Sequence, residues 1–131
     1  MRKDISFDSP IESMGFKKSL QLEFDWYVTH PEERHDDFVV DTGPGKIIVD
    51  GFLWTSQGGY TLTEDARIFS RTVFLEVTAE NTHFGIKIPM HHTYNAVIGD
   101  LPSGRYNLKV MHTYPLHEKT VEIVDTVIKV P

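Results

Sequence analysis

Apolar and polar side chains alternate along most of this chain. In the clearest run, Leu20, Leu22, Phe24, Trp26 and Val28 alternate with polar neighbours, which predicts a strand with one buried face. Similar alternation recurs near residues 47–53, 60–62, 73–77, 84–88, 94–98, 106–110 and 121–130. Turn-forming stretches rich in Gly, Pro, Asn and Ser separate these runs. The pattern therefore predicts an all-β, antiparallel sandwich of seven or eight strands.

The chain divides into an N-terminal arm and one domain. Residues 1–18 contain Pro10 and only weak alternation, so we expect an arm that adds an edge strand or stays mobile. Residues 19–131 form the predicted β-sandwich domain, in which a phase break at residues 124–126 indicates a bulge or bend. The expected core is Leu22, Phe24, Trp26, Val49, Leu75, Val77, Ile86, Tyr94, Ala96, Tyr106, Leu108 and Val110.

Composition narrows the classes of function. With 131 residues, 40% of them hydrophobic and 24% charged, the chain is typical of one globular domain. The net charge of −6, without a cluster of Lys and Arg, argues against nucleic-acid binding and against anionic membranes. No apolar run is long enough for membrane insertion. The absence of cysteine excludes disulfides, thiolate nucleophiles and cysteine-ligated metals.

One segment carries a family resemblance. Residues 94–112 read Tyr-Asn-Ala-Val-Ile-Gly-Asp-Leu-Pro-Ser-Gly-Arg-Tyr-Asn-Leu-Lys-Val-Met-His, and residues 59–79 contain a compatible strand pair. These stretches resemble small bacterial immunoglobulin-like or prealbumin-like β-sandwich proteins of uncharacterised function. The resemblance implies an immunoglobulin-like sandwich with a tyrosine corner. In that corner a Leu-Pro turn crosses between sheets, Gly104 permits a tight backbone, and the Tyr106 hydroxyl bonds to the upstream chain.

The same resemblance bears on cell location. A native start at Met1 would indicate a cytoplasmic protein, since no apolar signal segment follows it. The proteins that the chain resembles are mostly secreted, which implies an extracytoplasmic mature form from which a signal peptide was removed. Both locations remain open.

Histidine is enriched, with seven in the chain. Imidazole with thioether favours copper, and imidazole alone suits zinc, nickel or copper. If the loops gather at one end of the sandwich, the histidines there could hold copper or zinc, with His91, His92, His112 and His117 as predicted ligands. The alternative is that these are solvated loop and strand-edge histidines.

Residues 38–43, Phe-Val-Val-Asp-Thr-Gly, match the signature of dimeric retroviral-type aspartic proteases. The resemblance implies that Asp41 would share a proton with its counterpart in a second subunit and activate water. Residues 97–99, Val-Ile-Gly, would brace that loop, although Pro44 departs from the family pattern. Asp-Thr-Gly is also a common turn sequence, so a turn is the competing interpretation.

Aromatic side chains on outer sheet faces suggest an interface. A register that buries Ile47, Val49 and Leu53 turns Phe52 and Trp54 outward, and Phe74 faces outward on its own strand. Residues 1–18 or 30–45 could instead cover these rings, or the register could be reversed at Gly51. We therefore expect a non-catalytic binding or accessory module, with a protein partner or self-association through its end loops or an aromatic sheet face.

Overall fold

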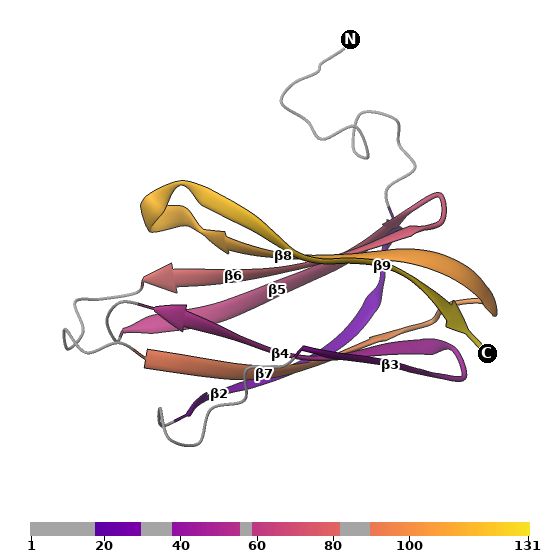
Figure 1. The fold of residues 1–131 in the computed structure, drawn as a ribbon, viewed down its shortest axis with the longest axis horizontal. Helices are drawn as coiled ribbons and strands as arrows, with labels where there is room; N and C mark the ends of the chain where they lie inside the picture. Colours follow the sequence, from indigo (N-terminus) through magenta and orange to yellow (C-terminus); the bar gives the residue numbers. More distant parts are fainter. Residues whose placement is uncertain (1–17, 30–37, 56–58, 82–89) are drawn as a thin grey trace, which may run out of the picture.

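Two β-sheets packed face to face make up the described part of the protein (Figure 1). The computed structural model describes residues 18–29, 38–55, 59–81 and 90–131. The strands are β1 (Lys18–Ser19), β2 (Gln21–Thr29), β3 (Val39–Gly43), β4 (Lys46–Thr55), β5 (Tyr60–Phe69), β6 (Thr72–Asn81), β7 (Met90–Gly99), β8 (Gly104–Tyr114) and β9 (Lys119–Val130). Apart from the two-residue β1, the described residues contain eight strands, so the predicted all-β sandwich is confirmed.

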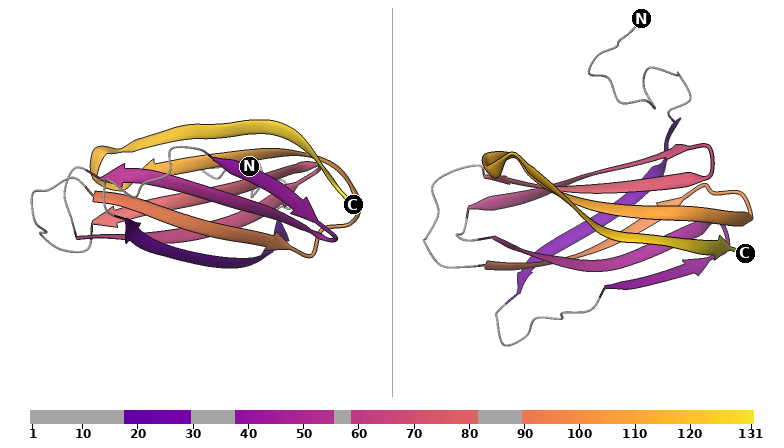
Figure 2. Two further views of the ribbon diagram at one scale, coloured as in Figure 1. Left: turned by 60° about the horizontal axis from the view of Figure 1, so that its bottom comes forward. Right: turned by 45° about the horizontal axis from the view of Figure 1, so that its top comes forward.

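The two layers differ in strand number and order. One sheet has five strands in the order β1-β5-β6-β8-β9, and the other has four in the order β2-β7-β4-β3. All neighbouring pairs are antiparallel except β6 and β8, which run parallel. The chain changes sheet four times, between β1 and β2, β4 and β5, β6 and β7, and β7 and β8. Strands β3 and β9 lie beside each other where the sheet edges meet (Figure 2).

The core lies between the sheets and follows the alternation in the sequence. Of the twelve side chains expected there, eight are buried: Val49, Leu75, Val77, Tyr94, Ala96, Tyr106, Leu108 and Val110. Leu22, Phe24 and Trp26 are only half-buried against that core, because β2 is an edge strand. Ile86 and the rest of the run near residues 84–88 lie outside the described residues, as do residues 1–17.

A tyrosine near the start of β8 is hydrogen-bonded to the backbone of the connection from β7. The hydroxyl of Tyr106 donates to the carbonyl oxygen of Pro102 at 2.6 Å. Gly104 has φ 151°, a conformation that side chains disfavour. The guanidinium of Arg71 lies 4.4 Å above the Tyr106 ring. The hydrogen bond expected for Tyr106 is therefore present, and it fixes the chain where it crosses between the sheets.

Tyr106→Phe is expected to lower the free energy of unfolding by about 1 kcal/mol, because it removes one part-buried hydrogen bond and keeps the ring. Urea denaturation followed by circular dichroism measures this loss. An unchanged midpoint would show that the bond to Pro102 contributes nothing to stability.

Strand β9 contains a bulge. Val110 pairs with Val124 while the next residue, Met111, pairs with Glu122, so Ile123 is the extra residue. Its side chain is 36% exposed. The irregularity predicted at residues 124–126 is thus confirmed one position earlier, and it turns Val121 and Val124 toward the same side of the strand.

Candidate functional site

The outer face of the four-stranded sheet carries side chains in cross-strand rows. Strand pairing gives one row of Glu23, Val97, Ile48 and Asp41, and a second row of Asp25, Asn95, Asp50 and Val39. A third row contains Tyr27, Thr93 and Phe52. Neighbouring strands are about 4.8 Å apart and successive rows about 6.7 Å apart, so these side chains form one continuous surface.

Aromatic rings cluster at one end of this face. His91 stacks on Phe52 with ring centroids 5.3 Å apart, and Trp54 meets the same imidazole edge-on at 5.1 Å. The ring of Phe38 lies 5.0 Å from that of Phe52. Tyr27, in the same row as Phe52, is 58% exposed. The cluster therefore combines a half-buried, sterically fixed ring with an exposed one.

Four exposed carboxylates share this face with the rings: Asp25 and Asp50 lie in the row next to Tyr27 and Phe52, and Glu23 and Asp41 lie one row further along. Asp50 accepts a hydrogen bond from the side-chain amide of Asn95 at 2.6 Å, and Asp41 accepts one from the backbone N–H of Thr42 at 2.8 Å. Within the described part of the chain, none of the four forms an ion pair. None of the four is neutralised by an ion pair in the described structure, and Lys46, a cation on the same strand as Asp50, lies near Glu23 on this face.

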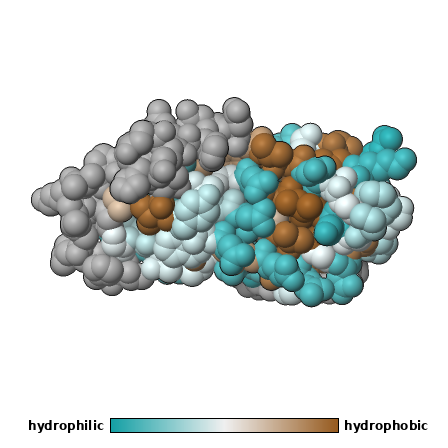
Figure 3. Space-filling view, turned by 90° about the horizontal axis from the view of Figure 1, so that it is seen from below, coloured by the Kyte–Doolittle hydropathy of each residue, from teal (hydrophilic) through white to brown (hydrophobic). Residues whose placement is uncertain are grey.

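The outer face of the five-stranded sheet differs in charge. Lys109 Nζ lies 3.8 Å from Glu122 and 4.0 Å from Asp125, and Arg67 is paired with Asp65. Charges of both signs thus neutralise one another there. Figure 3 shows the molecule from the side of the four-stranded sheet, where hydrophobic and hydrophilic residues lie next to one another.

Two histidines point into the interior between the sheets. Nε2 of His112 is hydrogen-bonded to the Tyr94 hydroxyl at 2.7 Å, and Nε2 of His92 to the Thr55 hydroxyl at 3.0 Å. Burial lowers the pKa of His112 to about 4. Burial, with a smaller contribution from neighbouring His91, lowers the pKa of His92. Both imidazoles are therefore neutral at pH 7.

The four histidines predicted as metal ligands lie in different surroundings. His91 and His92 are consecutive on β7, so their side chains point to opposite faces of the sheet. His112 faces the core, and His117 is exposed in the short 3₁₀ helix between β8 and β9. The described residues contain no group of three or more His, Asp or Glu side chains that could hold a metal ion. Copper or zinc binding stays a prediction, and His30, His35 and His83 lie outside the described ranges.

The predicted interface residues fall on two surfaces. The register predicted for β4 is confirmed, since Ile47 and Val49 are buried while Phe52 and Trp54 are half-buried on the outer side. Phe74 lies on the outer side of β6, which belongs to the other sheet. Phe52 and Trp54 can therefore act together, and Phe74 cannot join them.

Asp41 lies on β3, an edge strand of the four-stranded sheet. Its strand forms a hairpin with β4, and the segment at residues 97–99 lies on β7, with β4 between them. The carboxylate is exposed on the sheet face. A catalytic role for Asp41 across a dimer stays a prediction, and its position makes it part of the acidic face.

Comparison with known proteins assigns no relative to this chain: no family model, curated protein or solved structure matches it. The resemblance of residues 94–112 to immunoglobulin-like sandwiches therefore stays an expectation based on those residues. In the described ranges no helix has the length and apolar character needed to span a membrane.

Proposed function

We propose that the protein is a non-catalytic binding module that docks a basic protein surface on the outer face of its four-stranded sheet. The observation that carries this proposal is the row of rings beside four exposed carboxylates without ion pairs in the described structure. We define the docking face as Glu23, Asp25, Tyr27, Asp41, Asp50 and Phe52.

The rings supply the contact energy of this face. Aromatic side chains bury large areas with few rotatable bonds, and they are enriched among residues that dominate protein interfaces. Phe52 is held between Phe38 and His91, so little conformational entropy is lost when a partner covers it. Tyr27 is 58% exposed and can be covered by a partner without rearrangement of the strands.

The carboxylates define the chemistry of the partner. Complementary potentials accelerate encounter and suppress wrong partners, so an acidic face favours a surface rich in Lys and Arg. A nucleic acid would be repelled by the same charges. Because these carboxylates stand on paired strands, their spacing is fixed before the partner arrives.

We further propose that the sandwich is of the immunoglobulin-like type. The bond from Tyr106 to Pro102 supports this assignment, together with the change of sheet between β7 and β8. Domains of this architecture commonly present sheet faces and end loops to partners, but the architecture does not by itself assign a function.

The docking face is tested by reversing two of its charges. In the Glu23→Lys, Asp25→Lys double variant, we expect the loss of a basic protein that wild type retains on affinity purification from the cells that produce it. Both side chains are exposed at the sheet edge, so the variant should fold. The readout is the set of proteins identified by mass spectrometry, followed by titration of the recovered partner at several salt concentrations.

The matched control is Glu122→Lys with Asp125→Lys on the five-stranded sheet, which changes the net charge by the same amount. These residues form exposed ion pairs with Lys109, and Asp125 accepts an exposed hydrogen bond from the Asn107 side chain at 3.2 Å, contacts that contribute little to stability. The control should keep the partner, and binding should weaken as salt rises. Retention of the same partners by the docking-face variant, or their loss only in the control, would overturn the proposal.

A further inference from the structure

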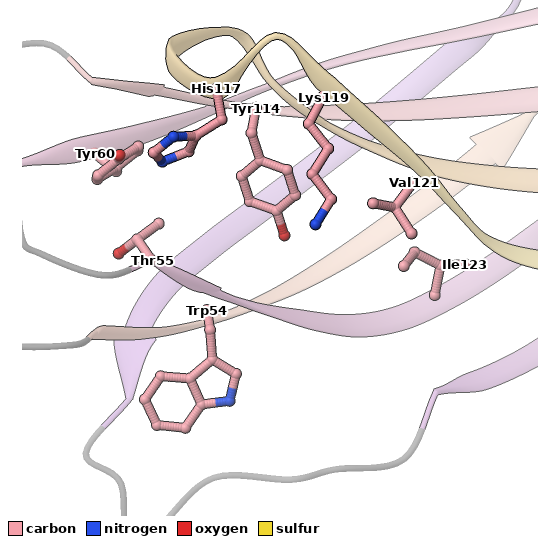
Figure 4. Close-up of a pocket in the computed structure, with 8 residues that line it drawn as sticks. All are labelled: Trp54, Thr55, Tyr60, Tyr114, His117, Lys119, Val121 and Ile123. Carbon is pink, nitrogen blue, oxygen red and sulfur yellow. The ribbon is translucent and has the colours of Figure 1, made fainter.

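A pocket of about 470 Å³ opens between the edges of the two sheets, away from the carboxylates of the docking face (Figure 4). Its walls come from the end of β4, the start of β5, the end of β8, the 3₁₀ helix and the start of β9. The lining residues are Trp54, Thr55, Tyr60, Tyr114, His117, Lys119, Val121 and Ile123. This volume lies within the range of about 300–1,000 Å³ typical of small-molecule sites.

Most of the pocket wall is apolar or aromatic. Tyr60 and Tyr114 contribute rings, the Trp54 ring points away from them on the other side of β4, and Val121 and Ile123 lie at the opposite end in Figure 4. Val121 and Ile123 are two residues apart on β9, so both side chains reach the same opening, and the bulge lies at Ile123. A ligand here would bury an apolar or aromatic body against these side chains.

The charged lining is basic, although the chain carries a net charge of −6. In Figure 4 the Lys119 amine and the Tyr114 hydroxyl both point into the space above Trp54. No Asp or Glu is among the described residues that line the pocket, and Lys119 has no ion pair with the described residues. The amine is therefore available to an anion.

A buried hydrogen bond fixes the inner wall of the pocket at Thr55. The Thr55 hydroxyl lines the pocket and is hydrogen-bonded to Nε2 of buried His92 at 3.0 Å. Burial raises the pKa of Tyr114, so its hydroxyl stays protonated and can donate to a bound oxygen. The Lys119 amine and the Tyr114 hydroxyl together form a paired donor site for one carboxylate.

We propose that this pocket binds a small organic acid with an aromatic or branched apolar body and a single carboxylate. The body lies against Tyr114 and Val121, and the carboxylate contacts the Lys119 amine and the Tyr114 hydroxyl. This site is separate from the proposed docking face, because none of the residues that define that face line the pocket.

The test uses phenylacetate as the probe and phenylacetamide as its uncharged counterpart, with binding to ¹⁵N-labelled protein followed by NMR. Phenylacetate should saturate with a dissociation constant on the order of 1 mM, as expected for a ligand of this size. The shifted amides should belong to residues 54–60 and 114–123. Phenylacetamide should bind about tenfold more weakly, since it loses a charge-assisted hydrogen bond.

Lys119→Met removes the amine and keeps the length of the side chain. It should weaken phenylacetate binding about tenfold and leave phenylacetamide unchanged. Lys129→Met is the matched control, because Lys129 is exposed on the same strand and does not line the pocket. Ile123→Phe should weaken both probes by filling the opening.

Three results would overturn this proposal: no saturable shift with phenylacetate, equal affinity for acid and amide, or equal effects of Lys119→Met and Lys129→Met. The Glu23→Lys, Asp25→Lys variant should bind phenylacetate as wild type does. A failure of the docking face and a failure of this pocket are therefore distinguishable.

Discussion

Replacing Gly51 with alanine is expected to lower the free energy of unfolding by about 3 kcal/mol. A Cβ atom at this position on β4 would lie 2.5 Å from Cε1 of Phe38 and from Cζ of Tyr94, and 2.6 Å from the Tyr94 hydroxyl. Tyr94 is 1% exposed, so its ring has little space to move. Displacing the ring would also break its hydrogen bond to His112, and a buried polar group would lose its partner.

Gly99→Ala on the neighbouring strand β7 is the matched control. A Cβ atom there would lie 3.6 Å from the nearest atom, Oε1 of Gln21, which is ordinary van der Waals contact. The control should therefore unfold at the same urea concentration as wild type or slightly above it. In a Tyr94→Leu background the cost of Gly51→Ala should fall, because one of the two clashing rings is gone. Equal stability of the two alanine variants would contradict this explanation of Gly51.

Alternation predicted which face of most strands is buried, because each strand here packs one side against the opposite sheet. The predicted inward positions on β6 and β8, such as Leu75, Val77 and Leu108, are all fully buried. The prediction was less accurate for Leu22 and Trp26, which are half-buried. Whether a strand lies at a sheet edge depends on pairing between distant segments. Local periodicity cannot predict that pairing.

Strand β3 was not predicted as a strand, although Phe38, Val39 and Val40 are apolar. Only five residues pair, and residues 42–45 have strong turn chemistry, so the sequence pattern predicts a long loop there. A two-residue turn at Pro44 and Gly45 in fact joins β3 to β4 as a hairpin, and Gly45 has φ 74°. This hairpin brings Asp41 onto the docking face.

The surroundings of the histidines could have been predicted in part. His92 is in phase with Tyr94 and Ala96, and His112 is in phase with Leu108 and Val110, so alternation already placed both imidazoles toward the core. The enrichment in histidine, by contrast, favours metal ligation. The partners of these imidazoles could not be predicted, because Tyr94 with His112 and Thr55 with His92 meet through strand registers that the sequence does not specify.

The pocket could not be predicted from the sequence either, because it too depends on how distant strands are placed. Lys119, Val121 and Ile123 show the two-residue spacing of an ordinary strand. For Trp54 the sequence predicts only a ring that faces outward. Their shared opening depends on where the edge of one sheet passes the edge of the other.

Acidification from pH 7 to pH 4 is expected to remove about 3 kcal/mol of stability through His112. Burial lowers its pKa from 6.5 to about 4 in the folded protein. Between these pH values the unfolded chain binds a proton that the folded protein does not bind, so the free energy of unfolding falls as the pH falls. The pKa of His92 is also lowered, so its contribution has the same sign in its own window.

The urea midpoint of unfolding is measured as a function of pH. The decisive variant replaces the buried pair Tyr94 and His112 with apolar side chains. Tyr94→Phe with His112→Leu removes both hydrogen-bonding groups together and leaves no unpaired partner, so it should fold and lose most of the dependence between pH 6.5 and pH 4. His117→Gln is the control for the loss of one histidine, since His117 is exposed in the folded protein. A pH profile in the double variant equal to that of wild type would show that the neutral His112 imidazole does not couple folding to pH.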